Sequence, residues 1–222
     1  MKINWRDEWL NLFLIAAMFI AAAVSWSSAA DSIPVHWGIT GEPDRYGGKF
    51  EGLLLIPIIT IGIYLMLLFI PRIDPKRTNY ERFAGVYCII RTVMVIFMVA
   101  LHGAIIASVL GAGIDIGMTV MVMVGIMLAV LGNYFGKLKP TWFVGIRTPW
   151  TLTSELSWNK THRLGGRMFV IIGLLLAAAG IIGQDLVFYL VFSLLLVMIV
   201  FLVVYSYFVW KTDPDRRNGL TR

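Results

Sequence analysis

The sequence predicts an all-α membrane protein, a bundle of six membrane-spanning helices with both termini in the cytoplasm. Three observations lead to this prediction. The 222 residues are 59% hydrophobic and 14% charged, with a mean hydropathy of +0.80, whereas soluble domains are about 25% charged. The apolar residues form six runs, each matched to a bilayer core of about 30 Å. The basic residues fall almost entirely on alternate connections between those runs.

The six runs follow one another along the chain, separated by polar connections. They span residues 10–30, 53–70, 92–111, 116–134, 168–182 and 186–210. The fifth has only 15 residues, so we expect it to borrow from its flanks, whereas the sixth has 25 and is expected to tilt or protrude. This composition argues against a disordered chain and a water-soluble enzyme. The single cysteine, Cys88, excludes an intramolecular disulfide.

The first run has a second interpretation, as a secretory signal peptide. Lys2 and Arg6 precede it, and Ser28-Ala29-Ala30 has the small residues of a cleavage site. The apolar region of a signal peptide is usually about 7–15 residues long, which is shorter than this run. We therefore expect an uncleaved first helix.

The basic residues predict the orientation of the bundle. Sixteen of the 19 lysines and arginines lie in the terminal segments or in the second and fourth connections, and only Arg45 and Lys49 lie on the opposite side. By the positive-inside rule, both termini are cytoplasmic. Because the net charge of +6 is spread over four segments, we expect no direct nucleic-acid binding. All eight tryptophans fall near a predicted helix end or in a connection, as interface anchors do.

The polar residues singled out within or at the edge of the predicted membrane spans are Arg91, His102 and Asn133. Ionisable residues at such depth are functional hypotheses by default. We expect Arg91, at the start of the third run, to snorkel to the interface as an anchor. For His102, which shares a helix face with Arg91, we favour a neutral ring bonded to a neighbouring helix, with a proton relay or ligand contact as the alternative.

The outer connection between the first two runs is rich in glycine and proline, which predicts fixed turns. We expect a structured outer cap whose rim includes His36, Trp37 and Asp44. His36, Glu42 and Asp44 could in principle bind a metal, but their spacing matches no standard site. No metal and no cofactor are predicted.

The long cytoplasmic connection before the fifth run predicts a short amphipathic helix. Thr153 or Ser154 can cap it, with Glu155 in its first turn. Glu155, Trp158 and His162 then share one face, and the basic residues share another; these are Lys160, Arg163 and Arg167. Three roles stay open: a surface helix on anionic headgroups, a binding platform, or catalysis by Glu155 and His162.

A resemblance to the SdpI-type immunity family is carried by the run Val144-Gly145-Ile146-Arg147-Thr148-Pro149-Trp150-Thr151-Leu152, followed by Trp158, His162 and Arg163. The outer segment is similar to that family's N-terminal domain of unknown function, through Ile33-Pro34-Val35-His36-Trp37, Gly41, Pro43 and Asp44.

This resemblance implies a multi-pass protein of the bacterial cell (inner) membrane that gives immunity to a secreted toxic peptide. It also implies signalling, in which an ArsR-like repressor is held at the membrane. The positions that match the family signature are Gly145, Arg147, Thr148, Pro149, Trp150, Thr151, Trp158, His162 and Arg163. We predict one integral bundle over residues 1–222, with an N-terminal part at 1–85 and an SdpI-like part at 86–222.

Two classes of function therefore remain. The first is an immunity protein that binds or senses a membrane-active toxic peptide, with membrane lipid, the peptide and the repressor as partners. The alternative is a small-molecule, ion or lipid transporter, or a membrane enzyme. In that alternative Arg91 and His102 would line a path, or Glu155 and His162 would perform chemistry.

Overall fold

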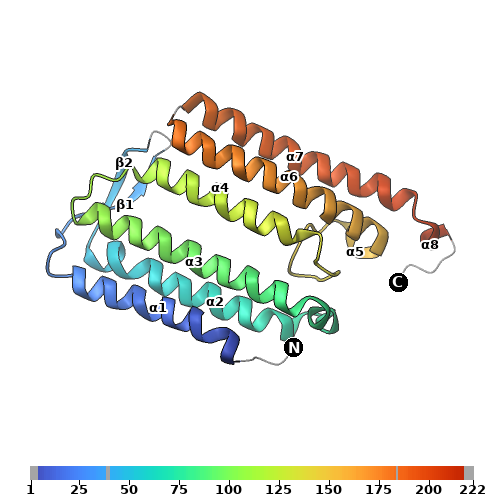
Figure 1. Ribbon diagram of the computed structural model, residues 1–222, viewed down its shortest axis with the longest axis horizontal. Coiled ribbons are helices and arrows are strands. Elements are labelled where there is room, and N and C mark those ends of the chain that lie inside the picture. Colours follow the sequence, from blue (N-terminus) through green and yellow to red (C-terminus); the bar gives the residue numbers. More distant parts are fainter. Residues whose placement is uncertain (1–4, 39–40, 184, 218–222) are drawn as a thin grey trace.

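The computed structural model describes residues 5–38, 41–183 and 185–217 as six long helices with short connections (Figure 1). The long helices are α1 (Trp5–Ser25), α2 (Leu55–Ile73), α3 (Ala84–Val109), α4 (Ile116–Phe135), α6 (Glu155–Ile182) and α7 (Asp185–Lys211). The short elements are β1 (Ile33–Trp37), β2 (Pro43–Gly47), the π-helix η1 (Phe50–Leu54), the 3-10 helix η2 (Arg77–Phe83), α5 (Pro149–Thr153) and α8 (Pro214–Arg217). Over the described residues, six helical segments are long and apolar enough to cross a membrane, which confirms the predicted all-α membrane fold with six spanning helices.

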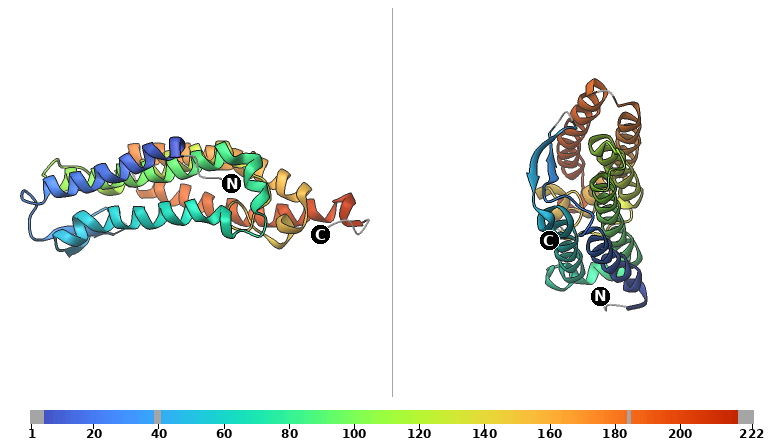
Figure 2. Two further views of the ribbon diagram at one scale, coloured as in Figure 1. Left: turned by 90° about the horizontal axis from the view of Figure 1, so that it is seen from below. Right: turned by 90° about the vertical axis from the view of Figure 1, so that its left-hand side faces the viewer.

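The long helices form two layers. In Figure 2, α1, α3, α4 and α6 lie side by side, and α2 and α7 lie against one face of that row. Helix α3 packs against α1, α2 and α4. Helix α6 packs against both α4 and α7. The two halves of the chain therefore meet at α3 and α4.

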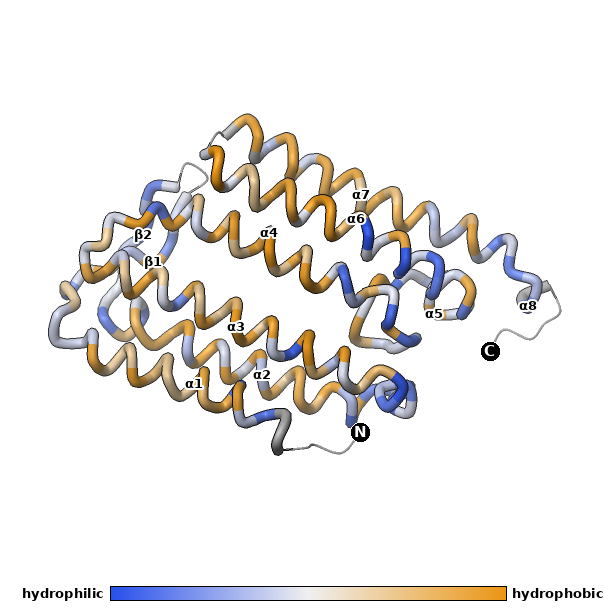
Figure 3. The backbone as a smooth tube through the Cα atoms, in the orientation of Figure 1, coloured by the Kyte–Doolittle hydropathy of each residue, from blue (hydrophilic) through white to orange (hydrophobic). Residues whose placement is uncertain are grey.

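The two ends of the bundle differ in composition. One end, here called the hairpin end, carries the antiparallel pair β1–β2. The other, here called the basic end, holds residues 74–83 and 136–154, and Figure 3 shows hydrophilic residues gathered there. Helix α1 begins and α7 ends at the basic end (Figure 1).

Two spanning helices begin well before the predicted apolar runs. Helix α3 starts at Ala84, so Arg91 lies two turns inside it. Helix α6 starts at Glu155, so the predicted separate amphipathic helix is wrong. The segment 155–167 forms the first turns of α6, because Trp158 and His162 are buried in the bundle. The short helix of this connection is α5 instead.

The hairpin is anchored on the bundle by apolar contacts. Ile33 of β1 is 1% exposed and packs with Leu53 of η1 and Ala22 of α1. A Cβ on Gly52 would lie 2.6 Å from Ile33 Cγ2, so the backbone of η1 at Gly52 contacts the side chain of Ile33 in β1. This hairpin is the one addition to the predicted all-helical architecture among the described residues.

Helices α4 and α6 touch through glycines at two levels. A Cβ on Gly132 would lie 2.7 Å from the carbonyl oxygen of Gly166, and one on Gly173 would lie 2.5 Å from that of Gly125. Real Cβ contacts are never this short, so the backbones cross in direct contact. Small residues permit such approach in membranes, where packing rather than hydrophobic burial holds helices together.

We expect Gly173→Ala to force α4 and α6 apart. The clash is with backbone, which cannot move as a side chain does, so the free energy of unfolding should fall by about 1–3 kcal/mol. Thermal unfolding in detergent checks this. The matched control is Gly103→Ala in α3, where no atom lies within 4 Å of the new Cβ. Equal melting temperatures for the two variants would contradict the close-contact interpretation.

Candidate functional site

The family-like run between α4 and α6 forms a network of hydrogen bonds with the start of α6; we call residues 141–162 the inner knot. At its centre, His162 Nε2 accepts from the backbone N–H of Ile146 at 2.8 Å. His162 Nδ1 donates to the Trp158 carbonyl at 2.8 Å, which assigns the neutral tautomer. The ring stacks on the Trp158 indole with centroids 4.0 Å apart. His162 and Trp158 are both 0% exposed, so this pair is a packed core of the knot.

Gly145 sits directly over this pair. Its φ of +111° lies in a region that side chains avoid. A Cβ there would overlap His162 Nε2 and lie 3.1 Å from Trp158 Cη2. Glycine is therefore required for the ring to reach the Ile146 N–H.

Threonines and serines of the knot tie it to α7. Thr148 and Thr151 form a capping box around the first turn of α5, where Pro149 occupies the N1 or N2 position. The Thr148 hydroxyl also meets the Ser206 hydroxyl of α7 at 3.0 Å. Ser157 donates to the Ser206 carbonyl at 2.8 Å, which ties α6 to the same point of α7.

Of the two predicted caps, Thr153 and Ser154, it is Ser154 that caps the start of α6; its hydroxyl oxygen accepts from the Ser157 N–H at 3.0 Å. Ser154 also donates to the buried carboxylate of Asp213. Since Asp213 follows α7, this bond fastens the end of α7 to the start of α6.

The connection between α2 and α3 is hydrogen-bonded to the inner knot through Asp74. The sequence did not predict a role for this residue. Asp74 is 2% exposed. It accepts from the Tyr80 hydroxyl at 2.9 Å and from the Trp142 N–H at 3.0 Å. Asn79 donates to the Pro140 carbonyl at 2.7 Å. The two connections of the basic end therefore form one bonded cap, although they lie about 60 residues apart in the chain.

The other predicted residues of this loop are exposed or half-buried. Arg147 is exposed and donates to the Trp142 carbonyl at 2.7 Å. Glu155 and Arg163 are exposed. Trp150 is half-buried, with its ring 5.2 Å from that of Tyr207. The family-like run thus contains residues that build the knot and a smaller set that reaches solvent.

The tryptophan pattern needs one correction. Trp9, Trp26 and Trp142 are exposed, as interface anchors would be. Trp158 is not an anchor, because it is 0% exposed and donates through Nε1 to the Leu138 carbonyl at 2.9 Å. Trp158 precedes the apolar run that begins at residue 168, so the sequence did not show that it lies inside α6.

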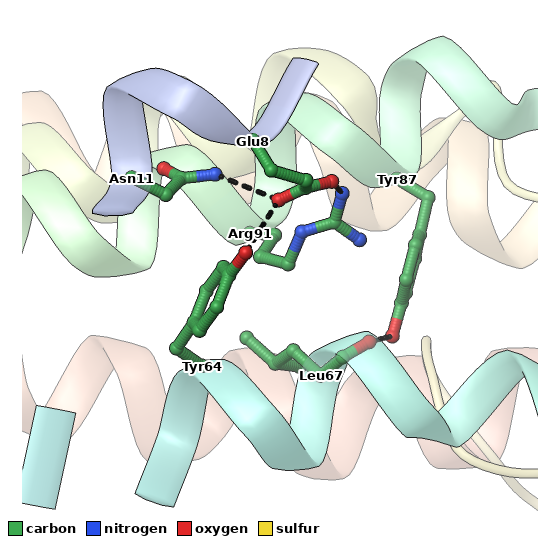
Figure 4. A network of polar contacts seen from close by, with 6 residues as sticks. All are labelled: Glu8, Asn11, Tyr64, Leu67, Tyr87 and Arg91. Carbon is green, nitrogen blue, oxygen red and sulfur yellow. Dashed lines mark hydrogen bonds and ion pairs between the residues drawn. The ribbon is translucent and has the colours of Figure 1, made fainter. Parts of the chain in front are cut away.

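A second polar site lies inside the bundle between α1, α2 and α3 (Figure 4); we call it the buried ion-pair cluster. Arg91 and Glu8 form an ion pair with side chains 2% exposed. Glu8 Oε2 also accepts from the Tyr64 hydroxyl at 2.9 Å and from Asn11 Nδ2 at 3.3 Å. The guanidinium lies 5.7 Å from the centre of the Tyr87 ring.

This arrangement overturns the prediction that Arg91 is an interfacial anchor. Its side chain turns inward because α3 begins earlier than its apolar run, which places Arg91 beside Glu8. Glu8 was missed because it precedes the first apolar run. The usable signal was the rule that intramembrane charges are paired, which requires an acidic partner for Arg91.

His102 lies deeper on the same face of α3, as expected. It is 1% exposed, and its Nε2 donates to the Leu53 carbonyl at 2.9 Å. This is the expected bond from a histidine to a neighbouring helical segment. Asn133, by contrast, is exposed near the end of α4.

The rim of the hairpin carries the predicted outer residues. His36 Nδ1 donates to Asp44 Oδ1 at 2.6 Å, and both side chains are more than half exposed. Trp37 is half-buried. Across the described residues, no three His, Cys, Asp or Glu side chains gather as a metal site would require.

Together, the fold and these sites define a multi-pass helical membrane protein with a bonded cap at one end and a strand hairpin at the other. Residues 137–206 match the SdpI/YfhL protein family, and residues 13–61 match the domain of unknown function DUF1648, so the predicted family resemblance is confirmed. The first match covers the inner knot together with α6 and much of α7, and the second covers α1 from Phe13 onward, the hairpin and the start of α2.

Relatives among characterised and uncharacterised proteins agree with these matches. The chain is 21% identical to the immunity protein SdpI of Bacillus subtilis over 202 residues, which cover 91% of this chain and 95% of that protein. It is 34% identical to an uncharacterised protein of Archaeoglobus fulgidus over 59 residues, 27% of this chain and 32% of that one. No solved structure matches the chain. The six apolar helices and the likeness to SdpI support a multi-pass protein of the bacterial cell membrane.

Proposed function

We propose that this chain is a membrane immunity protein that protects a bacterial cell from a membrane-active toxic peptide. The observation that carries the proposal is the likeness to the Bacillus subtilis immunity protein, because it extends over nearly the whole of both chains. A likeness of that extent includes both the hairpin end and the basic end. The same proposal divides the chain into an N-terminal part, residues 1–85, and an SdpI-like part, residues 86–222.

In this proposal the hairpin end meets the peptide. The hairpin projects from the bundle with His36, Asp44 and Arg45 exposed, and Trp37 half-buried beside them. A rim of this kind offers both charge and aromatic surface to an amphipathic peptide. By the positive-inside rule, this end faces outward, where a secreted toxin arrives.

In the same proposal, the basic end transmits peptide binding to a cytoplasmic partner. Arg147 and Arg163 of the family-like run and the neighbouring Glu155 are exposed charged residues within or beside the inner knot. We propose that they contact a cytoplasmic partner such as an ArsR-like repressor. Signalling of this kind requires two states of the protein that differ in their affinity for the partner.

The packing does not favour the transporter and enzyme alternatives. Both ring nitrogens of His162 are bonded to backbone groups, so it cannot exchange protons with the exposed Glu155. His102 is 1% exposed and bonded to Leu53, which is a packed arrangement rather than the lining of a path. The likeness to an immunity protein also supports a non-enzymatic role.

A survival assay tests the proposal. Bacillus subtilis cells that lack their own immunity protein would express the wild type, Arg147→Ala or an empty vector, and be exposed to the secreted toxic peptide. We expect the wild type to restore survival. Arg147→Ala should accumulate normally in the membrane, because it loses one bond on an exposed side chain.

The assay separates protection from signalling. If Arg147→Ala protects like the wild type but no longer recruits the repressor to membrane fractions, the basic end serves signalling. Equal sensitivity of wild-type cells and empty-vector cells, at matched membrane expression, would reject the immunity role.

A further inference from the structure

Helices α4 and α6 run in opposite directions, and their glycine contacts fix which side chains stand level with one another. Gly125 meets Gly173, and Gly132 meets Gly166 nearer the basic end. As the residue number rises along α4 it falls along α6, which is the pattern of antiparallel packing.

The residue that follows each contact glycine lies about 100° around its helix. Because the two helices are antiparallel, that rotation brings both following residues to the same side of the pair. The four residues concerned are Ile126 and Asn133 of α4, and Arg167 and Leu174 of α6. All four are exposed, which agrees with this placement.

The opposite side of the pair is occupied by α7. Gly165 and Ile172 each precede a contact glycine, and both are buried. A Cβ on Gly165 would lie 3.3 Å from Leu202 of α7, and Ile172 belongs to the same apolar cluster as Leu202. The exposed side of the α4–α6 pair therefore faces away from α7.

This exposed side changes its chemistry in layers. At the Gly125–Gly173 level it presents Ile126 and Leu174, which are 53% and 58% exposed. At the Gly132–Gly166 level it presents the amide of Asn133 and the guanidinium of Arg167. One turn further toward the basic end lies Arg163, also exposed, whose stem packs over Gly136 with Cγ 3.4 Å from a Cβ built there.

The two arginines are free to bind an anion. Over the described residues, neither Arg163 nor Arg167 has an acidic partner within salt-bridge distance. Guanidinium groups match phosphate through paired N–H donors, and an amide adds a neutral donor beside them. Basic sites between membrane helices on the cytoplasmic side bind anionic lipid headgroups.

We propose that Asn133, Arg163 and Arg167 form a binding site for the phosphate of one anionic phospholipid, with its acyl chain lying on Ile126 and Leu174. The sequence of a polar level followed by an apolar level favours a lipid over a free anion. The cationic groups lie level with the end of α4, toward the basic end, and the exposed apolar groups follow along the same side of the pair, as headgroup and acyl chain do. This site shares Arg163 with the surface proposed to contact the cytoplasmic partner, but its test uses the purified protein and does not depend on the immunity function.

Native mass spectrometry of the full-length protein in detergent tests the site. The protein would be titrated with phosphatidylglycerol or phosphatidylcholine, and retention of bound lipid compared for the wild type and Arg163→Gln/Arg167→Gln. We expect a preference for phosphatidylglycerol that falls roughly tenfold in the double variant, since each arginine near an anionic headgroup strengthens binding severalfold. The matched control is Arg72→Gln/Lys211→Gln, which removes two exposed cations from the basic ends of α2 and α7.

Each outcome decides the matter. A loss confined to the Arg163/Arg167 variant supports the site. An equal loss in the control variant shows a general charge effect and overturns it, as does a wild type without preference between the two lipids. Inorganic phosphate is included as a competitor; if it displaces the lipid at equal concentration, the site binds a free anion instead.

Discussion

Replacing Arg91 by alanine should be among the most destabilising single changes in this protein. Arg91 and Glu8 have side chains only 2% exposed, so the substitution leaves a carboxylate buried between three helices without its counter-charge. Breaking a buried ion pair in this way costs about 3–5 kcal/mol of the free energy of unfolding. Thermal or SDS unfolding of the purified protein in detergent would measure the loss.

A double-mutant cycle separates the pair from its surroundings. Glu8→Leu combined with Arg91→Leu removes both charges, so it should be less destabilising than the sum of the two single changes. Arg72→Ala is the matched control, since Arg72 is exposed and lies over the exposed Phe69 ring of α2. If Arg91→Ala is no more harmful than Arg72→Ala, the buried ion-pair cluster does not hold α1 on α3.

The second large effect is expected for Gly145→Ala in the inner knot. The new Cβ would enter the space of His162 Nε2 and press on the Trp158 ring. A side chain at a φ of +111° adds backbone strain to that overlap. We expect strain and overpacking together to lower the free energy of unfolding by about 2–5 kcal/mol.

The site of the structural change in Gly145→Ala can be measured separately from the loss of stability. Hydrogen exchange of the Ile146 amide should rise sharply in Gly145→Ala, because that N–H loses its bond to His162. Gly48→Ala is the control: no atom lies within 4 Å of its new Cβ, so it should behave like the wild type. An unchanged Ile146 amide in Gly145→Ala would contradict the proposed role of the glycine.

The two variants also address different links between the halves of the chain. Arg91→Ala weakens contacts among α1, α2 and α3, whereas Gly145→Ala loosens the cap at the basic end. Tyr87 and Tyr80 lie between these sites, with ring centroids 5.1 Å apart and perpendicular. The aromatic cluster around them includes Trp158, so both substitutions act on one continuous packed region.

The membrane class and the six helices followed from the sequence alone. A chain with 59% hydrophobic and 14% charged residues favours a lipid environment, and its long contiguous apolar runs satisfy their backbone hydrogen bonds there as helices. A helix cap at Thr153 or Ser154 followed from the sequence for a similarly local reason, since a capping side chain bonds only to the next turn, and the structure has Ser154 as the cap. Family-like residues were recognised from their order, which is a property of sequence.

Only the tertiary structure decided what those residues do. His162 looked available for chemistry until Ile146 and Trp158 were seen to occupy both of its nitrogens. Arg91 looked like an interfacial anchor because its partner, Glu8, lies 83 residues away in the chain. Hydropathy reports each residue's preference for lipid or water, whereas the pairing of buried charges and backbone groups depends on which segments meet in space, and local pattern does not specify that.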